Sequence, residues 1–291
     1  MPFSDLPAGV LALFAAMIFG ATMILAKKSM PHIDPFEGAW ISIGATMVLF
    51  WALTPLALDW QDFQTPWIFF FFGLGLLQPF VSVSLNYLGT ERLGPTISAT
   101  VAGTAPLFSV VCAVLFLNEA VTPPVALGTM GIVAGVAVLS WSGGTPRTWA
   151  TSALMFPLGT AIARGVAHAV GKYGLEHLQF PLIAAVMSYS SAFLAGLLWR
   201  SPNLRGFVAG LGGPGLKWVL MAGMGNGVGI LCFLTALQKG AVVVVSPIGA
   251  TFPLFTMLYS ALFFRGERIT RRTVAGALLI VPSVMAIGFL R

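Results

Sequence analysis

Long apolar runs separated by short polar breaks fill the chain from end to end. Ten of the runs come close to the roughly 20 residues that an α-helix needs to cross a membrane. The runs are continuous and do not alternate apolar with polar residues, which excludes a membrane β-barrel. The predicted spans cover residues 7–27, 36–57, 66–89, 95–117, 124–141, 151–171, 181–199, 215–238, 242–264 and 271–290. The pattern therefore predicts an all-α membrane protein with ten transmembrane helices.

The composition excludes most other classes of protein. The chain is 57% hydrophobic and 8% charged, whereas about a quarter of the residues in a soluble domain are charged. The predicted loops are too short for a soluble domain, and the first run is too long for a signal peptide. The net charge of +6 includes no polybasic run, so a nucleic-acid partner is not expected. Cys112 and Cys232 lie singly in apolar runs, and neither a metal nor a cofactor is indicated.

The second half of the chain resembles the first. Pro106-Leu107-Phe108 recurs as Pro253-Leu254-Phe255, and Glu119 recurs as Glu267. We interpret residues 1–145 and 146–291 as two repeats of five helices in one integrated bundle. Because five is odd, the second repeat must cross the membrane in the opposite direction. Inverted repeats are typical of secondary transporters, whose binding site lies near the middle of the membrane between the two halves.

The order and duplication of several short motifs identify a family resemblance. The motifs are Phe19-Gly20-Ala21-Thr22, Leu85-Asn86-Tyr87-Leu88, Gly94-Pro95-Thr96, Ala105-Pro106-Leu107-Phe108, Phe116-Leu117-Asn118-Glu119-Ala120-Val121-Thr122, Phe252-Pro253-Leu254-Phe255 and Phe264-Arg265-Gly266-Glu267-Arg268-Ile269-Thr270. Over its whole length the chain resembles the drug/metabolite transporter superfamily, in the branch of EamA-type ten-helix exporters. The resemblance implies export of small metabolites across the bacterial inner membrane. Amino acids, particularly aromatic ones, are the leading substrates that it suggests.

Two ionisable residues of the sixth predicted span are the first candidates for a binding site. Arg164 and His168 are four residues apart, so they share one face of the helix. An arginine near the centre of the membrane is costly unless it faces a cavity or a partner. Arg164 is therefore a candidate ligand for a substrate carboxylate, although it could instead cap helix carbonyls or extend along a cavity wall. His168 is a second candidate contact, or a packed polar group.

The lack of a carboxylate deep in the predicted spans bears on whether transport is coupled to a proton. No Asp or Glu lies deep in a predicted span, whereas many proton-coupled carriers use such a group. His168 could carry the proton instead. We favour facilitated diffusion, because export down a metabolite gradient needs no ion and Arg164 would disfavour a protonated His168.

Further polar residues interrupt the apolar helices. Gln78, Ser82 and Asn86 form a stripe in the third span, with Tyr87 beside it; they could bind a zwitterion or join helices to one another. The same two roles are open for Asn226, which lies in a glycine-rich run. Other candidate contacts are Thr22, Thr100 and Ser246, and the candidate hinges are Pro79, Pro106 and Pro253. The aromatic and Met side chains that could line a cavity are Phe19, Met23, Trp40, Met187, Tyr189, Met224 and Phe252. Glu119 and Glu267 are expected to have structural roles at helix ends.

The charges of the loops predict an orientation. If the N-terminus were cytoplasmic, Lys172, Lys239 and Arg291 would lie inside. Eleven basic residues would then lie outside: Lys27, Lys28, Arg92, Arg147, Arg200, Arg205, Lys217, Arg265, Arg268, Arg271 and Arg272. The positive-inside rule therefore favours both termini outside, although members of the resembled family usually have both inside.

Several rival functions are weaker. A membrane enzyme would need a nucleophile with its base, a metal cluster or paired carboxylates, and the spans contain none of these patterns. A channel would need a filter motif. The runner-up is a carrier of sugar phosphates or nucleotide sugars, or an exporter of cationic drugs, with the same fold. A ten-helix bundle can enclose its own cavity, so we expect a monomer to suffice, with a small-molecule substrate and the lipid bilayer as its partners.

Overall fold

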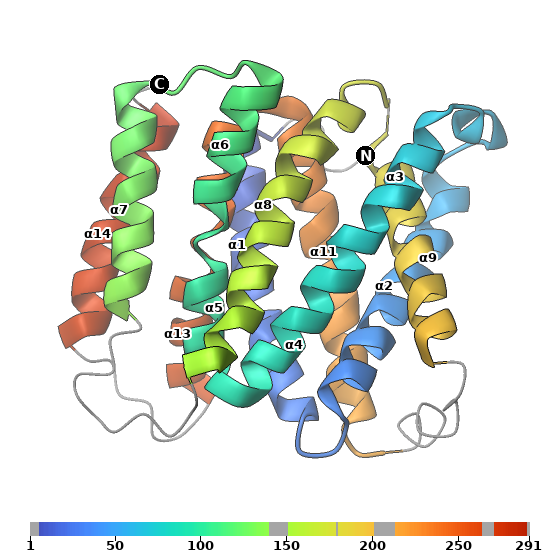
Figure 1. The fold of residues 1–291 in the computed structure, drawn as a ribbon, viewed down its shortest axis with the longest axis horizontal. Helices are drawn as coiled ribbons and strands as arrows, with labels where there is room; N and C mark the ends of the chain where they lie inside the picture. Colours follow the sequence, from blue (N-terminus) through green and yellow to red (C-terminus); the bar gives the residue numbers. More distant parts are fainter. Residues whose placement is uncertain (1–5, 140–150, 179, 201–212, 264–270, 290–291) are drawn as a thin grey trace.

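A computed structural model describes residues 6–139, 151–178, 180–200, 213–263 and 271–289, and within these ranges it contains helices and no strand (Figure 1). Three short helical turns, η1 (Trp60–Phe63), η2 (Leu76–Val81) and η3 (Thr151–Leu154), accompany longer helices. These are α1 (Ala8–Ser29), α2 (Pro35–Ala57), α3 (Trp67–Gly75), α4 (Ser82–Leu93), α5 (Pro95–Ala102), α6 (Ala105–Leu117), α7 (Pro123–Leu139), α8 (Met155–Leu175), α9 (Pro181–Arg200), α11 (Leu216–Lys239), α12 (Val242–Gly249), α13 (Phe252–Phe263) and α14 (Arg271–Phe289).

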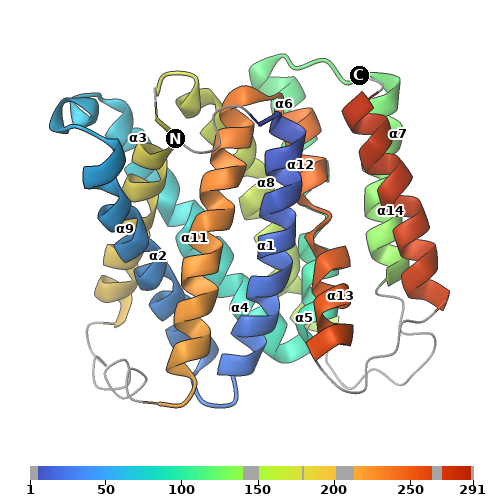
Figure 2. The same cartoon turned by 180° about the vertical axis from the view of Figure 1, so that it is seen from behind.

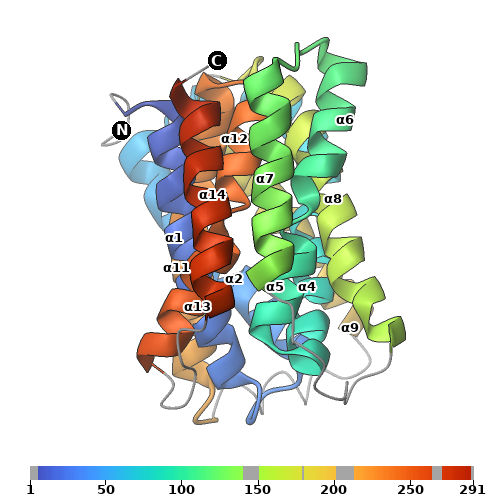
Figure 3. The same ribbon diagram turned by 90° about the vertical axis from the view of Figure 1, so that its left-hand side faces the viewer.

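The helices run back and forth between two ends of the bundle. The start of α1 and the end of α14 lie at the same end, which is at the top of Figure 1 and is called the upper end below. Figure 2 shows α1 descending from this end, whereas α8 ascends towards it in Figure 1. Figure 3 shows α7 and α14 packed against each other at one edge of the bundle.

The length and composition of the helices mark an integral membrane protein. Seven helical segments among the described residues are long and apolar enough to cross a membrane, and three further apolar helices are shorter. Large apolar side chains cover the outside of the bundle: Phe69, Leu115 and Leu127 are 67–74% exposed. A surface of this kind fits lipid and not water.

The third predicted span, residues 66–89, is not one continuous helix. Its helical path passes from α3 through the π-helical turn η2 into α4, and Gln78 has non-helical angles of φ −135° and ψ 108°. Pro79 follows Gln78, and proline disfavours a helical conformation in the residue before it. The path also ends later than predicted, at Leu93, where Gly94 takes a φ of +80° that favours glycine.

Two other predicted spans, 95–117 and 242–264, are also interrupted. The first divides into α5 and α6 between Ala102 and Ala105, and the second into α12 and α13 between Gly249 and Phe252. In each case a proline, Pro106 or Pro253, lies in the first turn of the second segment. Proline suits the start of a helix but cannot donate the backbone hydrogen bond that would continue the preceding one. The prolines therefore account for the division of both spans.

The first helix of each half packs against the divided helix of the other half. A methyl group added at Gly20 of α1 would lie 2.6 Å from Cβ of Phe255 in α13. A methyl group added at Gly165 of α8 would lie 2.5 Å from Cβ of Phe108 in α6. Gly165 follows Gly20 by 145 residues and Phe255 follows Phe108 by 147, so the two contacts occupy matching places in the two halves.

Glycines allow α11 to approach two neighbouring helices closely. A methyl group at Gly223 would lie 2.5 Å from the carbonyl oxygen of Ser42 in α2, and one at Gly229 would lie 2.7 Å from the Phe19 ring in α1. The hydroxyl of Thr46 donates a 2.6 Å hydrogen bond to the carbonyl of Gly223. The alternating glycines of this helix therefore have a packing role.

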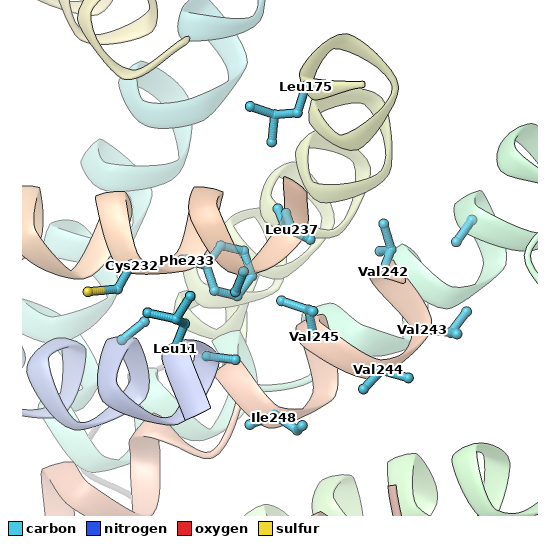
Figure 4. Close-up of a cluster of buried hydrophobic side chains, with 14 of the residues drawn as sticks. Leu11, Leu175, Cys232, Phe233, Leu237, Val242, Val243, Val244, Val245 and Ile248 are labelled. Carbon is cyan, nitrogen blue, oxygen red and sulfur yellow. The ribbon is translucent and has the colours of Figure 1, made fainter. Parts of the chain in front are cut away.

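An apolar cluster fills the upper part of the bundle. Figure 4 shows Leu11 of α1, Leu175 of α8, Phe233 and Leu237 of α11, and the valines of α12 that belong to it. At the same end Glu119 caps α12: its two carboxylate oxygens each accept a 2.9 Å hydrogen bond, from the backbone N–H groups of Val242 and Val243. Glu119 thus has a structural role at a helix end, and Glu267 lies outside the described residues.

Candidate functional site

A cavity in the middle of the bundle is surrounded by most of the long helices. It contains about 870 Å³ of empty space, counting the part that opens to solvent. Its lining begins near His168 and Phe233 and continues towards the lower end, as far as Ala26, Tyr87 and Ala222.

Arg164 supplies the positive charge of this cavity. It lies near the middle of α8, a helix of 21 residues, and it is partly buried. Its guanidinium carbon is 5.8 Å from the ring centroid of Phe252, which also lines the cavity. No Asp or Glu is among the described residues that line the cavity. The guanidinium therefore faces the cavity without a carboxylate from its walls.

His168 lies one turn further along α8 and links it to two other helices. Its Nδ1 atom is 3.0 Å from the hydroxyl oxygen of Ser246 in α12. The hydroxyl of Ser109 in α6 donates a 2.7 Å hydrogen bond to that same oxygen. The imidazole ring also packs on Phe233, with 4.6 Å between the ring centroids. These contacts fix the position of His168 at the wall of the cavity.

Tyr189 and Asn226 form a hydrogen-bonded pair on another wall. The side-chain amide of Asn226 in α11 donates a 2.7 Å hydrogen bond to the hydroxyl oxygen of Tyr189 in α9. The Tyr189 ring is fixed in turn by an edge-to-face contact with Phe50, at 5.2 Å between centroids. Because its oxygen accepts this bond, the Tyr189 hydroxyl still has its own hydrogen to donate to a ligand.

Asn86 and Tyr87 of α4 are buried at the cavity wall and keep unused hydrogen-bonding capacity. Their exposed fractions are 7% and 4%. The amide nitrogen of Asn86 contacts the sulfur of Met23 at 3.3 Å. Its oxygen Oδ1, like the hydroxyl of Tyr87, has no hydrogen-bond partner among the described residues. A buried polar atom without a partner is unusual, and at a cavity wall it is suited to bind a ligand.

The structure brings together most of the residues singled out in the sequence. Eight of the ten predicted contacts line the cavity: Thr22, Gln78, Asn86, Tyr87, Arg164, His168, Asn226 and Ser246. The ninth, Thr100, lies in α5, but its side chain is outside the described part of the chain.

Ser82 is the tenth predicted contact, and it does not reach the cavity. It is fully buried, and its hydroxyl donates a hydrogen bond to the side-chain oxygen of Gln78. Its carbonyl accepts a 3.3 Å hydrogen bond from Thr160 in α8. The non-helical angles of Gln78 break the regular i, i+4, i+8 stripe on which the prediction depended. Ser82 therefore contacts Gln78 and α8, and it is not among the described residues that line the cavity.

The aromatic and Met candidates divide into two groups. Phe19, Met23, Tyr189 and Phe252 line the cavity, whereas Trp40, Met187 and Met224 are not part of its lining. Trp40 stacks on Phe193 and donates a 3.1 Å hydrogen bond to its carbonyl, and Met224 is 52% exposed on the outside of α11.

Sequence reasoning named Pro106 and Pro253 as candidate hinges but missed the small residues at the joints of the two divided helices as part of the cavity lining. Ala102 and Ala105 on one side, and Gly249 and Ala250 on the other, all line the cavity. These residues have no polar side chain that could have indicated a site. The prolines that follow each joint, Pro106 and Pro253, were the available signal. Ser42 and Phe233 also line the cavity without having been predicted.

Comparisons with known proteins agree with a transporter. The chain is 25% identical over 138 residues to an uncharacterized transporter, sll1319, of Synechocystis sp., a match that covers 46% of this chain and 41% of that protein. Over 95 residues it is 37% identical to a probable 4-amino-4-deoxy-L-arabinose-phosphoundecaprenol flippase subunit, ArnE, of Pseudomonas aeruginosa. That second match covers 31% of this chain and 75% of the subunit.

A solved crystal structure shares the whole fold. It superposes with a TM-score of 0.76 over 98% of this chain and 99% of that chain, at 16% sequence identity. The sequence profile of the EamA-like transporter family matches this chain twice, over residues 6–141 and 151–289. Together these two segments include nearly all of the helical bundle and all of the residues named at the cavity. The chain therefore belongs to the EamA-like transporter family.

Proposed function

We propose that this chain exports small carboxylate-bearing metabolites, foremost amino acids with aromatic or other neutral side chains, through the central cavity by alternating access. The observation that supports this most directly is Arg164, a guanidinium in the middle of the bundle that faces the cavity, with no carboxylate among the described residues of its walls. Guanidinium and carboxylate form strong paired hydrogen bonds. The membrane makes an unpaired buried charge costly, so a substrate anion there is favoured.

The joints of the divided helices support an anionic group at the same place. α6 and α13 each begin beside the cavity, at Ala105 and Phe252. The N-terminal ends of helices carry partial positive charge. In secondary transporters the ends of divided helices commonly point at charged groups of the substrate.

Asn86 supports an amino group on the substrate. Its oxygen Oδ1 is buried at the cavity wall without a partner, and an ammonium group is a strong donor for such an acceptor. Since the described lining contains no carboxylate, the ammonium group would be bound by neutral acceptors and by aromatic faces such as Phe19 and Phe233. A zwitterion satisfies both Arg164 and Asn86, which a simple cation would not.

The similarity to ArnE supports a second candidate substrate, a lipid-linked amino sugar phosphate. Such a molecule also combines an anion with an amine, and Arg164 could bind its phosphate. Sugar phosphates and nucleotide sugars are less favoured, because a dianion normally needs two or more cationic contacts and Arg164 is the lone Lys or Arg among the described lining residues. The positive charge of the cavity also disfavours a cationic drug.

We further propose ten spans arranged as two inverted five-helix repeats, residues 1–145 and 146–291. Three observations support this arrangement: the double match of the family profile, the division of one helix in each half before a proline, and the reciprocal packing of Gly20 and Gly165. The helices that carry these glycines run in opposite directions (Figures 1 and 2). Pro79, Pro106 and Pro253 would then be the hinges of the alternating motion.

The membrane setting follows from the charges at the two ends. Lys27, Lys28, Arg92 and Lys217 lie at the lower end, and Lys172 and Lys239 lie at the upper end. Because the positive-inside rule favours basic residues on the cytoplasmic side, we propose that the lower end is cytoplasmic and that both termini lie outside the bacterial inner membrane. The cavity lining extends towards that lower end, where an exporter takes up its substrate. The described lining of the cavity comes from one chain, so we propose that a monomer suffices, and we propose facilitated transport without a coupled ion.

Efflux from proteoliposomes tests this function. The purified protein is reconstituted with labelled amino acids inside, and efflux is followed with and without a pH gradient. Saturable efflux that an amino acid on the outside accelerates, and that ignores the gradient, is the expected result. Competition by the amide or the amino alcohol of the same compound should be weak, because neither has a carboxylate. Efflux of a lipid-linked or phosphorylated sugar alone would replace the amino-acid assignment, and efflux that follows the gradient would contradict uncoupled transport.

A further inference from the structure

A second cavity adjoins the first, nearer the upper end of the bundle. It contains about 490 Å³ of empty space, again counting the part that is open, and lies between α3, α8, α9 and α11. The two cavities have five lining residues in common: Gln78, His168, Tyr189, Ile230 and Phe233. These shared residues form the partition between two neighbouring spaces, so a molecule in the first cavity lies directly beside the second.

All but one of the polar side chains of the second cavity belong to that partition. Gln78, His168 and Tyr189 also face the first cavity. The remaining polar residue, Ser188, donates a 2.9 Å hydrogen bond to the carbonyl of Phe71 and is thereby satisfied. The far walls are formed by apolar side chains, with Phe71, Leu74, Leu234 and Leu237 the largest of them. The far part of this space is therefore suited to an apolar group and offers nothing to a charged one.

Small residues leave the space open. Ala167 and Gly171 on α8, with Ala184 and Ala185 on α9, form two of its walls. A methyl group added at Gly171 would lie 3.6 Å from the nearest side-chain atom, Cδ2 of Leu74, which is an ordinary contact distance. The side chain of Leu74 thus does not block this position, and a larger residue at Gly171 would occupy the cavity.

We propose that the second cavity is a subsite for the side chain of the substrate, and that it selects large apolar side chains, aliphatic or aromatic. This inference depends on the proposed function, because it assumes a polar head group bound near Arg164 and Asn86 in the first cavity. The apolar part of the same molecule then passes the partition at His168 and Phe233 and is buried against Phe71 and Leu74. Burial of an aromatic or branched aliphatic group in such a space is favourable in itself.

Gly171→Val and Ala184→Val test the subsite from two different walls. The matched control is Gly73→Val on α3, because Gly73 is exposed and a methyl group there would meet no atom within 4 Å. Each purified variant is checked for a single peak in detergent and reconstituted, and efflux of labelled phenylalanine and of labelled alanine is measured. The ratio of the two rates is the readout, since a loss of folded protein lowers both rates equally.

Both subsite variants should lower the phenylalanine-to-alanine ratio about tenfold, since a few methyl groups in an apolar pocket change specificity by about this factor, whereas Gly73→Val should leave it unchanged. An unchanged ratio in both subsite variants, with alanine still transported, would overturn the subsite while the proposed function stood. If the wild-type protein transports neither amino acid, the proposed function fails and the subsite fails with it.

Discussion

At the scale of the residue, the cavity wall divides into groups that are already satisfied and groups that are not. His168, Tyr189 and Asn226 are each fixed by a hydrogen bond to another side chain. Arg164 and the oxygen of Asn86 face the cavity without such a partner in the part of the chain that the structure describes. Because an unsatisfied buried polar group costs free energy, these two positions are the ones where a bound substrate would gain most.

The Asn86→Leu substitution tests the assignment of the amino group. Leucine has a similar size but no acceptor, so binding of an ammonium group should weaken. A hydrogen bond to a charged group contributes about 1.5–3 kcal/mol, which corresponds to about a tenfold or larger rise in KM for an α-amino acid. KM is measured by efflux from proteoliposomes. The 2-oxo acid with the same side chain, used as a competitor, should keep its inhibition constant. An equal loss for both compounds would assign Asn86 to packing.

At the scale of the element, the two divided helices and the glycines opposite them determine how the halves fit together. Gly165 lies against the first turns of α6, and Gly20 lies against the corresponding turns of α13. In each contact the backbone of α1 or α8 packs close to the joint of a divided helix, and both joints line the cavity. A side chain at either glycine would push a divided helix away from its neighbour.

The Gly165→Ala substitution should destabilise the protein although alanine favours helix formation. The added methyl group would lie 2.5 Å from Cβ of Phe108, and overpacking of this kind costs about 1–3 kcal/mol. A lower Tm in detergent is the expected result. Gly73→Ala is the control: its methyl group meets open space, so its Tm should stay the same or rise. Equal Tm values for the two variants would show that the α8–α6 contact tolerates a side chain.

Sequence patterns predicted the helices well and their interruptions poorly. The long apolar runs were enough to locate nearly every helix, because the membrane requires continuous apolar segments. The same runs concealed the joints at 103–104 and 250–251, because Gly103-Thr104 and Ala250-Thr251 add one hydroxyl group each and no charge to the run. For the site, Arg164 and His168 were evident because ionisable groups are rare in spans. The second cavity was not predictable, since Gly171 and Ala184 contribute to it by being small.

At the scale of the whole molecule, the bundle has a basic lower end and a cavity whose lining extends towards it. Lys27, Lys28, Arg92 and Lys217 lie there, whereas Lys172 and Lys239 lie at the end where α1 begins. If the lower end is cytoplasmic, the molecule has the form of an exporter ready to receive substrate. The proposed direction of transport, out of the cell, therefore depends on which end of the bundle faces the cytoplasm.

Reporter fusions at the end of the sequence test this orientation. Alkaline phosphatase fused after Arg291 should be active, and green fluorescent protein at the same place should be dark, because both reporters would lie outside the inner membrane. Replacing Lys27 and Lys28 by Asn should increase the fraction of molecules with the reverse orientation, since these lysines contribute to the positive charge of the lower end. A bright fluorescent fusion together with an inactive phosphatase would reverse the assignment.

Efflux by Arg164 variants is the most direct test of the central claim, that Arg164 binds the carboxylate of the transported molecule. Arg164→Ala should lower amino-acid efflux from proteoliposomes tenfold or more, as loss of a charge-assisted contact of about 1.5–3 kcal/mol implies, with little change in the amount of folded protein. Arg164→Lys should be intermediate, because lysine keeps the charge but not the paired geometry. Transport and folded protein falling together in Arg164→Ala would contradict the claim and assign Arg164 to folding.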